Sequence, residues 1–446
     1  MSESDTGTVR VPLSLQLDFL RMMDDGSEGG PFGPRYTLAA GWRVRGPIDL
    51  DALRAALDDV VERHEALRTR IVLDDGEPYQ EICPPASPDL DVRDLTAGAA
   101  GREVRTEEFI NEVEESVSIG PTTPRLRAVL GRFDPEDAVL VFVAHHTIVD
   151  GWGLQVVFRD LVRCYTARGA GETPDLPPAP QYREYVAWQR RQAGTPATAR
   201  ARAFWREHLD GARVTPVPTD RPRTHDGYVT GWHRFMLEDE FRTATLDLAR
   251  ETRSSPFMVL LAAFLVVLRE RTGETDLVVP TLTAGRPATW MLDVVGVFYN
   301  FTPLRTDIGG CTTFREVVAR VRTACLKTYP NELTFPEVIS EAPELMTAVA
   351  VPEAAPVAFQ VIQHGVEAEP AAGVRFEAVR RRVVSTPVGS QIPDGILAEL
   401  DLHPEGGMFG KVAYTKHMFD ESTVVGLMSD LRAVLVDVVI GREQAA

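Results

Sequence analysis

Four prolines interrupt the chain between Gly169 and Gln181. Each proline removes a backbone N–H donor and fixes φ, so a helix cannot run through this stretch. The whole sequence has 446 residues, which is more than one hydrophobic core usually accommodates. We therefore predict two domains, at residues 1–180 and 181–446, with the proline-rich stretch as the linker between them.

Helical and strand-like patterns alternate on either side of this linker. In the first half, residues 48–61 repeat apolar side chains at helical spacing, and the apolar run Ala138–Val143 predicts a buried strand. In the second half, residues 256–271 predict a buried helix and residues 277–280 a strand. The predicted fold class is therefore α/β, of the mixed α+β kind.

Two adjacent histidines follow the predicted buried strand. His145 and His146 are followed by Asp150 and Gly151, so a carboxylate lies four positions beyond the second imidazole. Imidazole titrates near neutrality, so it can take a proton from a hydroxyl or amine that attacks an acyl group. A nearby carboxylate can hold the ring or its loop in place. Taken alone, the same pair also fits a structural or solvent-facing position at a strand end.

Charge and cysteine usage exclude several kinds of partner. The net charge of −18 argues against nonspecific nucleic-acid binding, which needs a basic surface. The four cysteines lack metal-ligand or redox spacing, so we expect reduced thiols and no metal site. The first residues are polar and acidic, and the apolar stretch at 257–268 is too short to cross a bilayer. We expect a cytoplasmic protein without a membrane partner.

An ordered set of motifs is similar to those of a known family. The spacing His-His-x-x-x-Asp-Gly resembles the signature of the chloramphenicol-acetyltransferase-like superfamily, which includes nonribosomal peptide synthetase condensation domains. Further stretches resemble the first, second, fourth and fifth condensation-domain motifs, and one keeps the outline of a later motif: Pro12–Leu20, Arg63–Thr69, Tyr182–Trp188, Val295–Arg305 and Asn331–Glu337. The resemblance spans nearly the whole chain.

This resemblance implies a fold and a set of site residues. The fold is a V-shaped pseudo-dimer of two chloramphenicol-acetyltransferase-like subdomains with a central tunnel. The candidate catalytic set contains His146 as the reacting imidazole, His145 in a more structural role, Asp150 holding the loop, and Gly151 as a small turn residue whose N–H faces the reacting carbonyl. Three arginines would support the site: Arg286, paired with Asp150 from the second domain, and Arg63 and Arg68, bracing the loop.

The activity implied by the resemblance is that of a free-standing condensation enzyme. No adenylation domain, phosphopantetheine site or thioesterase motif is recognisable in the sequence. The donor would be an acyl or aminoacyl thioester on a separate acyl or peptidyl carrier protein. The acceptor would be a small molecule or a carrier-bound group, with an alcohol giving an ester and an amine an amide. Such enzymes include those that attach β-amino acyl groups to enediyne or glycopeptide cores. No cofactor is expected, because the thioester is already activated.

Other functions remain open at this stage. An acyl-CoA-dependent O- or N-acyltransferase would share the histidine motif, and a noncatalytic recruitment domain would share the fold. An epimerisation domain would carry an additional Glu-Gly-His element, which is missing after the linker.

Two basic clusters are candidates for binding an acidic carrier protein, although each also fits a solvated surface. They comprise Arg190, Arg191, Arg200, Arg202 and Arg206 in one cluster and Arg380, Arg381 and Arg382 in the other.

Overall fold

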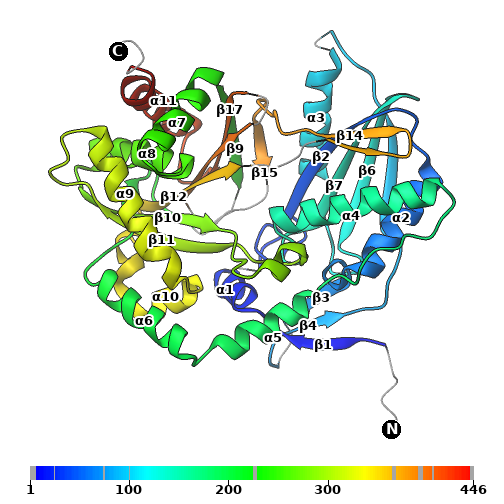
Figure 1. Cartoon of the computed structure of the whole chain (residues 1–446), viewed down its shortest axis with the longest axis horizontal. Helices are drawn as coiled ribbons and strands as arrows, with labels where there is room; N and C mark the ends of the chain where they lie inside the picture. The colour runs from blue at the N-terminus through cyan, green and yellow to red at the C-terminus, as the bar shows by residue number, and fades with distance from the viewer. Residues whose placement is uncertain are drawn as a thin grey trace. The chain divides into compact units, whose positions relative to one another are not determined.

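Two large sheets organise the protein, one in each of two structural units (Figure 1). The computed structural model describes residues 7–24, 26–73, 76–99, 101–224, 229–363, 368–389, 395–403 and 406–441. Unit 1 comprises Met1–Ala193, Ala284–Tyr299 and Val366–Arg380, and unit 2 comprises Gly194–Thr283, Asn300–Gly365 and Arg381–Ala446. Each unit combines helices with its sheet, so the predicted mixed α/β class is confirmed.

The sheet of unit 1 is built around the strand that ends at the histidine pair. Across the sheet, the strands are β13 (Ala368–Ala371), β14 (Val374–Ala378), β2 (Thr37–Arg45), β7 (Asp137–His145), β6 (Leu126–Asp134) and β5 (Asp89–Asp94). All nine residues of β7 are buried, as the apolar run predicted. A strand covered on both faces needs apolar side chains at successive positions.

Helices cover both faces of this sheet (Figure 1). Helices α2 (Leu50–Arg63) and α4 (Gly151–Gly169) pack against the even-numbered residues 138–144 of β7. Helix α3 (Gly101–Ser116) packs against the odd-numbered residues 139–143. Because side chains alternate along a strand, this arrangement fixes the direction in which β7 presents its last residue.

The remaining elements of unit 1 surround the base of the sheet. A three-stranded sheet has the order β1 (Val9–Pro12), β4 (Tyr79–Ile82) and β3 (Thr69–Val72). The others are α1 (Leu15–Met23), the 3-10 turns η1 (Glu65–Arg68) and η2 (Thr289–Asp293), and α5 (Tyr182–Gln192). Helices α1 and α5 are tied by buried side chains: the amide of Gln16 donates to the Tyr185 hydroxyl at 2.8 Å, and that of Gln189 donates to Gln16 at 3.0 Å.

Unit 2 has its own six-stranded sheet and a buried central helix. The sheet order is β15 (Thr386–Gly389), β9 (Thr230–Leu237), β17 (Met408–Thr415), β16 (Ile396–Leu402), β12 (Ala354–Gln363) and β8 (Pro216–Pro218). Strands β10 (Asp276–Thr283) and β11 (Asn300–Asp307) form a separate antiparallel pair. The helices are α6 (Pro196–His208), α7 (Asp239–Glu251), α8 (Pro256–Thr272), α9 (Phe314–Thr328), α10 (Phe335–Glu341) and α11 (Glu421–Leu435), with short turns at η3 (Tyr329–Asn331), η4 (Pro343–Val349) and η5 (Val436–Ile440). Residues 258–268 of α8 are all buried, as its continuous apolar sequence predicted.

The division into units differs from the domain boundary predicted at residues 180 and 181. The proline-rich stretch does lack helix and strand, but it connects α4 to α5 inside unit 1. It is held there, because the Arg63 guanidinium donates to the Pro177 carbonyl oxygen at 2.7 Å. The chain passes to unit 2 only after Ala193. Two later segments then return to unit 1, and one of them adds β14 to the edge of β2.

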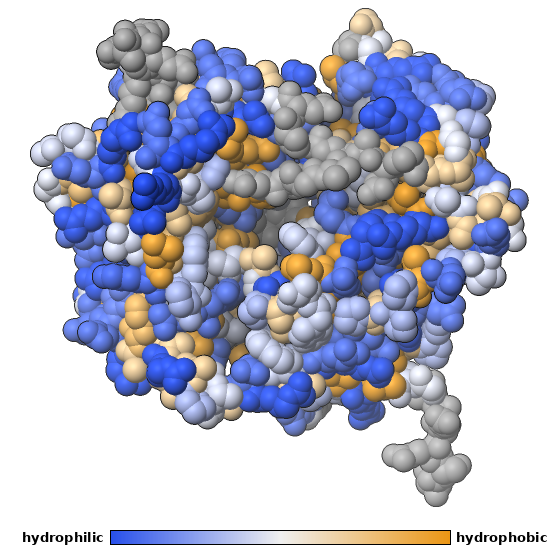
Figure 2. All heavy atoms as spheres, viewed as in Figure 1, coloured by the Kyte–Doolittle hydropathy of each residue, from blue (hydrophilic) through white to orange (hydrophobic). Residues whose placement is uncertain are grey.

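Hydrophilic residues cover most of the face shown in Figure 2, with apolar residues in separate small areas. Within the described residues, no single helix has the length and apolar content to cross a membrane. Helices α7 and α8 have that length and apolar content only when taken together, and the pair is bent by 105°. Helix α8 is the buried core helix described above.

Candidate functional site

His145 is the last residue of β7 and its ring is completely buried. Its Nε2 lies 2.9 Å from the carbonyl oxygen of Gly33, which only accepts hydrogen bonds, so Nε2 carries the proton. Its Nδ1 accepts from the backbone N–H of Thr147 at 3.3 Å. Burial, followed by the nearby Arg125 guanidinium, holds the pKa of His145 well below its usual value. Both ring nitrogens are therefore engaged in holding the loop, and the ring is neutral.

His146 is half-buried and its ring is fixed by the turn that follows it. Its Nδ1 lies 2.8 Å from the carbonyl oxygen of Val149, so the proton is on Nδ1 and the lone pair on Nε2. The backbone N–H of His146 donates to the carbonyl oxygen of Tyr36 at 2.8 Å. An imidazole held in this tautomer is chemically equipped to accept a proton at Nε2.

Asp150 joins three parts of unit 1 through one buried carboxylate. As the N-cap of α4, it accepts from the Gly153 N–H at 2.6 Å, which satisfies an open donor of the first turn. Its other oxygen accepts from the Phe298 N–H at 3.1 Å, and its own N–H donates to Gly296. Burial raises the pKa of Asp150, and the Arg286 guanidinium and these N–H donors oppose that rise.

Arg286 pairs with Asp150, as the resemblance implied. Its Nη2 donates to Oδ1 at 2.9 Å, and its guanidinium lies 3.8 Å from the centre of the Phe298 ring. Only 1% of the arginine side chain is exposed, so the pair is desolvated. Although Arg286 lies in the second half of the sequence, its segment belongs to unit 1. That segment is placed by Gly285, whose φ of +62° favours glycine.

Gly151 does not occupy the tight turn that we predicted for it. It is the first residue of α4, its φ lies outside the left-handed region, and no atom lies within 4 Å of the position of a Cβ. Its N–H belongs to the first turn of a helix, where backbone donors lack intrahelical partners. Gly151 is exposed, and because it has no side chain it leaves open space at the start of α4.

Arg63 and Arg68 lie in the motif that resembles the second condensation-domain motif, and they make different contacts. Arg63 donates from Nε to the buried carboxylate of Asp160 on α4 at 2.8 Å. His64 Nε2 lies 3.0 Å from the same carboxylate, and burial lowers the pKa of His64. Arg68 instead donates to the carbonyl oxygen of Cys83 at 2.6 Å. Arg63 thus braces α4, and Arg68 ties the end of η1 to the residue that follows β4.

Two tyrosines beside His146 were missed by the sequence analysis. The Tyr36 ring stacks on the His146 ring with centroids 5.3 Å apart, and the Tyr299 ring lies 5.1 Å from His146. Their hydroxyl groups are 2.9 Å apart. Tyr36 could have been suspected only from strand pairing, since β2 pairs Thr37 with His145. Tyr299 lay within a recognised motif, but nothing in its spacing indicated the contact.

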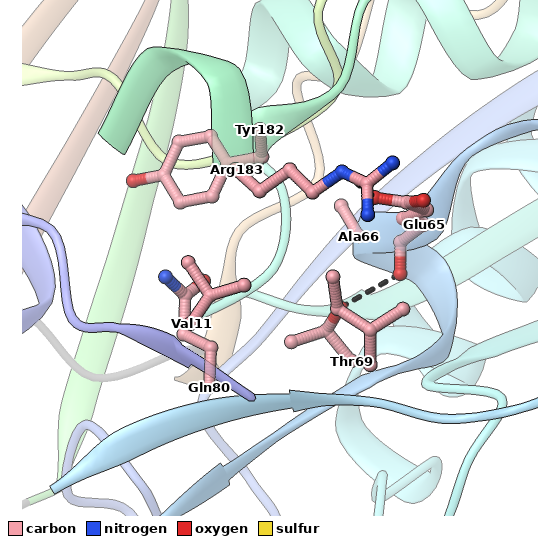
Figure 3. Close-up of a pocket in the computed structure, with 8 residues that line it drawn as sticks. Val11, Glu65, Ala66, Thr69, Gln80, Tyr182 and Arg183 are labelled. Carbon is pink, nitrogen blue, oxygen red and sulfur yellow. Dashed lines mark hydrogen bonds and ion pairs between the residues drawn. The ribbon is translucent and has the colours of Figure 1, made fainter. Parts of the chain in front are cut away.

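A small pocket in unit 1 lies outside the histidine loop. Figure 3 shows its lining, with the Arg183 side chain beside Glu65, and the two form an ion pair at 3.2 Å. Tyr182 lines the same pocket, while its hydroxyl donates to the carbonyl oxygen of Val297 at 2.7 Å. None of the candidate catalytic residues lines this pocket. Tyr182 therefore links this pocket to the Val297 segment.

The described residues contain no group of three or more His, Cys, Asp or Glu side chains placed to hold a metal. The four cysteines are free thiols, and burial raises the pKa of Cys164 to about 12.

The first of the two candidate basic clusters for binding a carrier protein is partly neutralised. Its members Arg202 and Arg206 pair with Glu341.

Comparison with known proteins identifies the family of the chain. The condensation-domain model matches residues 27–350. The chain belongs to the condensation-domain family. Members of this family are acyltransferases that form amide or ester bonds in nonribosomal peptide synthesis, so the predicted enzyme class and general activity, acyl transfer in natural-product biosynthesis, are confirmed.

Three similar proteins place the chain within this family. The SgcC5 protein from Streptomyces globisporus, crystallised with (R)-(-)-1-(2-naphthyl)-1,2-ethanediol and sucrose, is 42% identical, with a TM-score of 0.91 over 96% of this chain and 98% of that chain. A linear gramicidin synthase from Brevibacillus parabrevis is 30% identical over 93% of this chain, which spans 8% of that synthase. The first condensation domain of the calcium-dependent antibiotic synthetase shares the fold, with a TM-score of 0.78 at 18% identity over 97% of both chains.

The similarity in structure confirms the chloramphenicol-acetyltransferase-like pseudo-dimer as the fold class. Condensation domains act on substrates bound to carrier proteins, which agrees in general terms with the partner expected from the sequence.

Proposed function

We propose that this condensation-family chain transfers an acyl or aminoacyl group from a carrier-protein thioester to a hydroxyl group of an aryl 1,2-diol, forming an ester. The observation that carries the proposal is the orientation of His146, which holds its proton on Nδ1 and its lone pair on Nε2. The diol is suggested by SgcC5, which was crystallised with an aryl 1,2-ethanediol and matches 96% of this chain.

The proposed reaction uses His146 as the proton acceptor. An acceptor hydroxyl gives its proton to Nε2 while its oxygen attacks the thioester carbonyl carbon, so a C–O bond forms. The C–S bond then breaks, and the proton held by His146 passes to the leaving sulfur, which departs as a thiol. No external oxidant, reductant or cofactor enters this balance, because the thioester supplies the activation.

The other candidate residues have supporting roles in this proposal. Asp150 holds Val149 in the turn, and the Val149 carbonyl oxygen fixes the tautomer of His146. Arg286 keeps the Asp150 carboxylate charge-paired. The N–H of Gly151, at the start of α4, is proposed to donate to the oxygen of the reacting carbonyl, where negative charge develops. His145 holds the loop without touching the substrate.

The experiment is a mass-spectrometric assay with a carrier protein loaded with aminoacyl or acyl groups. The acceptors are a 1-aryl-1,2-ethanediol and the matched 2-amino-1-arylethanol, which separates ester from amide formation. We compare the native chain with His146→Ala, and with His208→Ala on α6 as the matched histidine control. Ester from the native chain and the control, with a loss of about 10²–10⁴-fold in His146→Ala, supports the proposal.

Three other outcomes contradict the proposal in distinguishable ways. Amide alone means that the acceptor is an amine. Product from an acyl-CoA donor but not from the carrier means an acyl-CoA-dependent acyltransferase. Stable binding of the carrier without any product means a recruitment domain.

A further inference from the structure

Two tyrosine hydroxyls form a pair beside the proposed catalytic imidazole. The oxygens of Tyr36 and Tyr299 are 2.9 Å apart. Both rings contact His146, with centroid distances of 5.3 and 5.1 Å. The proton-accepting group of the proposed reaction is thus accompanied by a pair of neutral hydroxyls that the proposed reaction does not use.

Each tyrosine is fixed by the same backbone connections that fix the histidine loop. Tyr36 directly precedes β2, which pairs with β7, and its carbonyl oxygen accepts from the His146 N–H. Tyr299 directly follows Phe298, whose N–H donates to Asp150. The tyrosines therefore approach His146 from a neighbouring strand and from the returning segment, and neither position depends on a flexible side chain.

The two tyrosines differ in how far they are exposed. Tyr36 is 6% exposed, whereas Tyr299 and His146 are both half-buried. The Tyr299 side chain, like that of His146, is therefore partly accessible to solvent, whereas Tyr36 is enclosed. In a hydroxyl pair, one phenol donates to the other, and a phenol oxygen has the capacity for more than one hydrogen bond.

Both phenols stay protonated at neutral pH. Burial raises the pKa of Tyr36 to about 12 and holds that of Tyr299 well above its usual value. The pair consequently presents hydrogen-bonding hydroxyls rather than a charge, and such groups suit a neutral alcohol.

We propose that the Tyr299 hydroxyl, oriented by Tyr36, binds the second hydroxyl of a 1,2-diol while the neighbouring hydroxyl gives its proton to His146. The inference rests on the proposed function and makes Tyr299 a specificity-determining residue for diols over mono-alcohols. The rings of Tyr299 and His146 are in contact, so the two residues are near enough to address neighbouring groups of one small acceptor. Removing the tyrosine oxygen leaves the second hydroxyl without this partner, which penalises the diol selectively.

The test compares a 1-aryl-1,2-ethanediol with the matched 2-arylethanol, which lacks the second hydroxyl. The variants are Tyr299→Phe and Tyr36→Phe, and the control is Tyr165→Phe, which removes a buried phenol that accepts from Asp49 elsewhere in unit 1. We measure kcat/KM for both acceptors with a carrier-bound donor, and Kd for both without any donor. Thermal unfolding of each variant verifies that it is folded.

We expect the native chain to prefer the diol in Kd and in kcat/KM. Tyr299→Phe should lower this preference at least tenfold while changing the mono-alcohol values less than about threefold, Tyr36→Phe should lower it less, and Tyr165→Phe should leave it unchanged. An unchanged preference in Tyr299→Phe, or an equal loss for both acceptors, overturns the inference. Selective diol binding that is lost in Tyr299→Phe, without turnover by the native chain, supports the binding role and refutes the proposed acyl transfer.

Discussion

His145 and His146 hold their protons on opposite ring nitrogens. His145 donates from Nε2 to the carbonyl oxygen of Gly33 at 2.9 Å, and His146 donates from Nδ1 to that of Val149 at 2.8 Å. Because carbonyl oxygens only accept, each contact determines one tautomer. Two neighbouring residues of the same type are thereby given different chemistry, with a fully engaged ring at the strand end and a base-competent ring in the turn.

This difference is directly measurable by nitrogen NMR. In protein with ¹⁵N-labelled histidine at pH 7.5, we expect a proton-bearing Nε2 for His145 and a proton-bearing Nδ1 for His146. Long-range ¹H–¹⁵N correlation spectra distinguish the two tautomers, and the variants His145→Asn and His146→Ala assign the signals. The same tautomer at both residues would contradict the contacts to Gly33 and Val149.

The pair of Asp150 and Arg286 predicts a large loss of stability when one partner is removed. Asp150→Ala leaves a guanidinium that is 1% exposed without its carboxylate, at a cost of about 3–5 kcal/mol. The matched control is Asp293→Ala, which breaks the exposed pair with Arg159 and should cost at most about 1 kcal/mol. Urea denaturation of the two variants measures both values. Equal losses would show that burial does not determine the strength of these pairs.

The buried imidazole of His145 predicts that stability declines in mildly acidic solution. Its pKa is lowered in the folded protein, so below pH about 6.5 the unfolded chain binds a proton that the folded chain does not. The contribution of the neutral His145 ring to the free energy of unfolding should therefore be complete above that pH. Below it, the free energy of unfolding should fall by about 1.4 kcal/mol per pH unit. We expect His145→Asn to have a shallower decline between pH 7.5 and 5.5. Identical slopes would mean that His145 titrates normally in the fold.

Two glycines at the site should respond oppositely to alanine. A methyl group at Gly285 would overlap the Phe298 carbonyl oxygen, and its φ of +62° strains any other residue, so Gly285→Ala should cost at least about 1–3 kcal/mol. Gly151→Ala adds a methyl group to open space at a helix start, and its stability should stay the same or rise by up to about 1 kcal/mol. Denaturation curves measure both. An activity loss in Gly151→Ala without a stability loss would locate substrate at that open space.

The sequence predicted the elements whose signals are local. The apolar run before the histidines became β7, and the apolar stretch at residues 256–271 became the buried helix α8. Contacts between distant segments carried no such signal. The pairing of Asp150 with Arg286 could be expected only from family resemblance, because 136 residues separate them. The contacts of Tyr36 with His146 required the register between β2 and β7, which composition and spacing do not determine.

The predicted domain boundary at residues 180 and 181 differs from the division into units for the same reason. Prolines mark where a helix stops, and α4 does stop at Gly169. They do not show which neighbours the chain meets afterwards. Gln189 of α5 bonds with Gln16 of α1, 173 residues earlier, and this buried contact keeps α5 in unit 1.

The returning segment 284–299 also determines the order in which the site can assemble during synthesis. Phe298, which donates to Asp150, is translated 148 residues after it. At roughly 5–20 residues per second, Asp150 is made about 7–30 s before Phe298, and Arg286 is made shortly before Phe298. Much of the first half can fold as it emerges, but the histidine loop reaches its final form only after part of unit 2 has been made. A gene divided after residue 193 would separate the histidines from the segment that completes their surroundings.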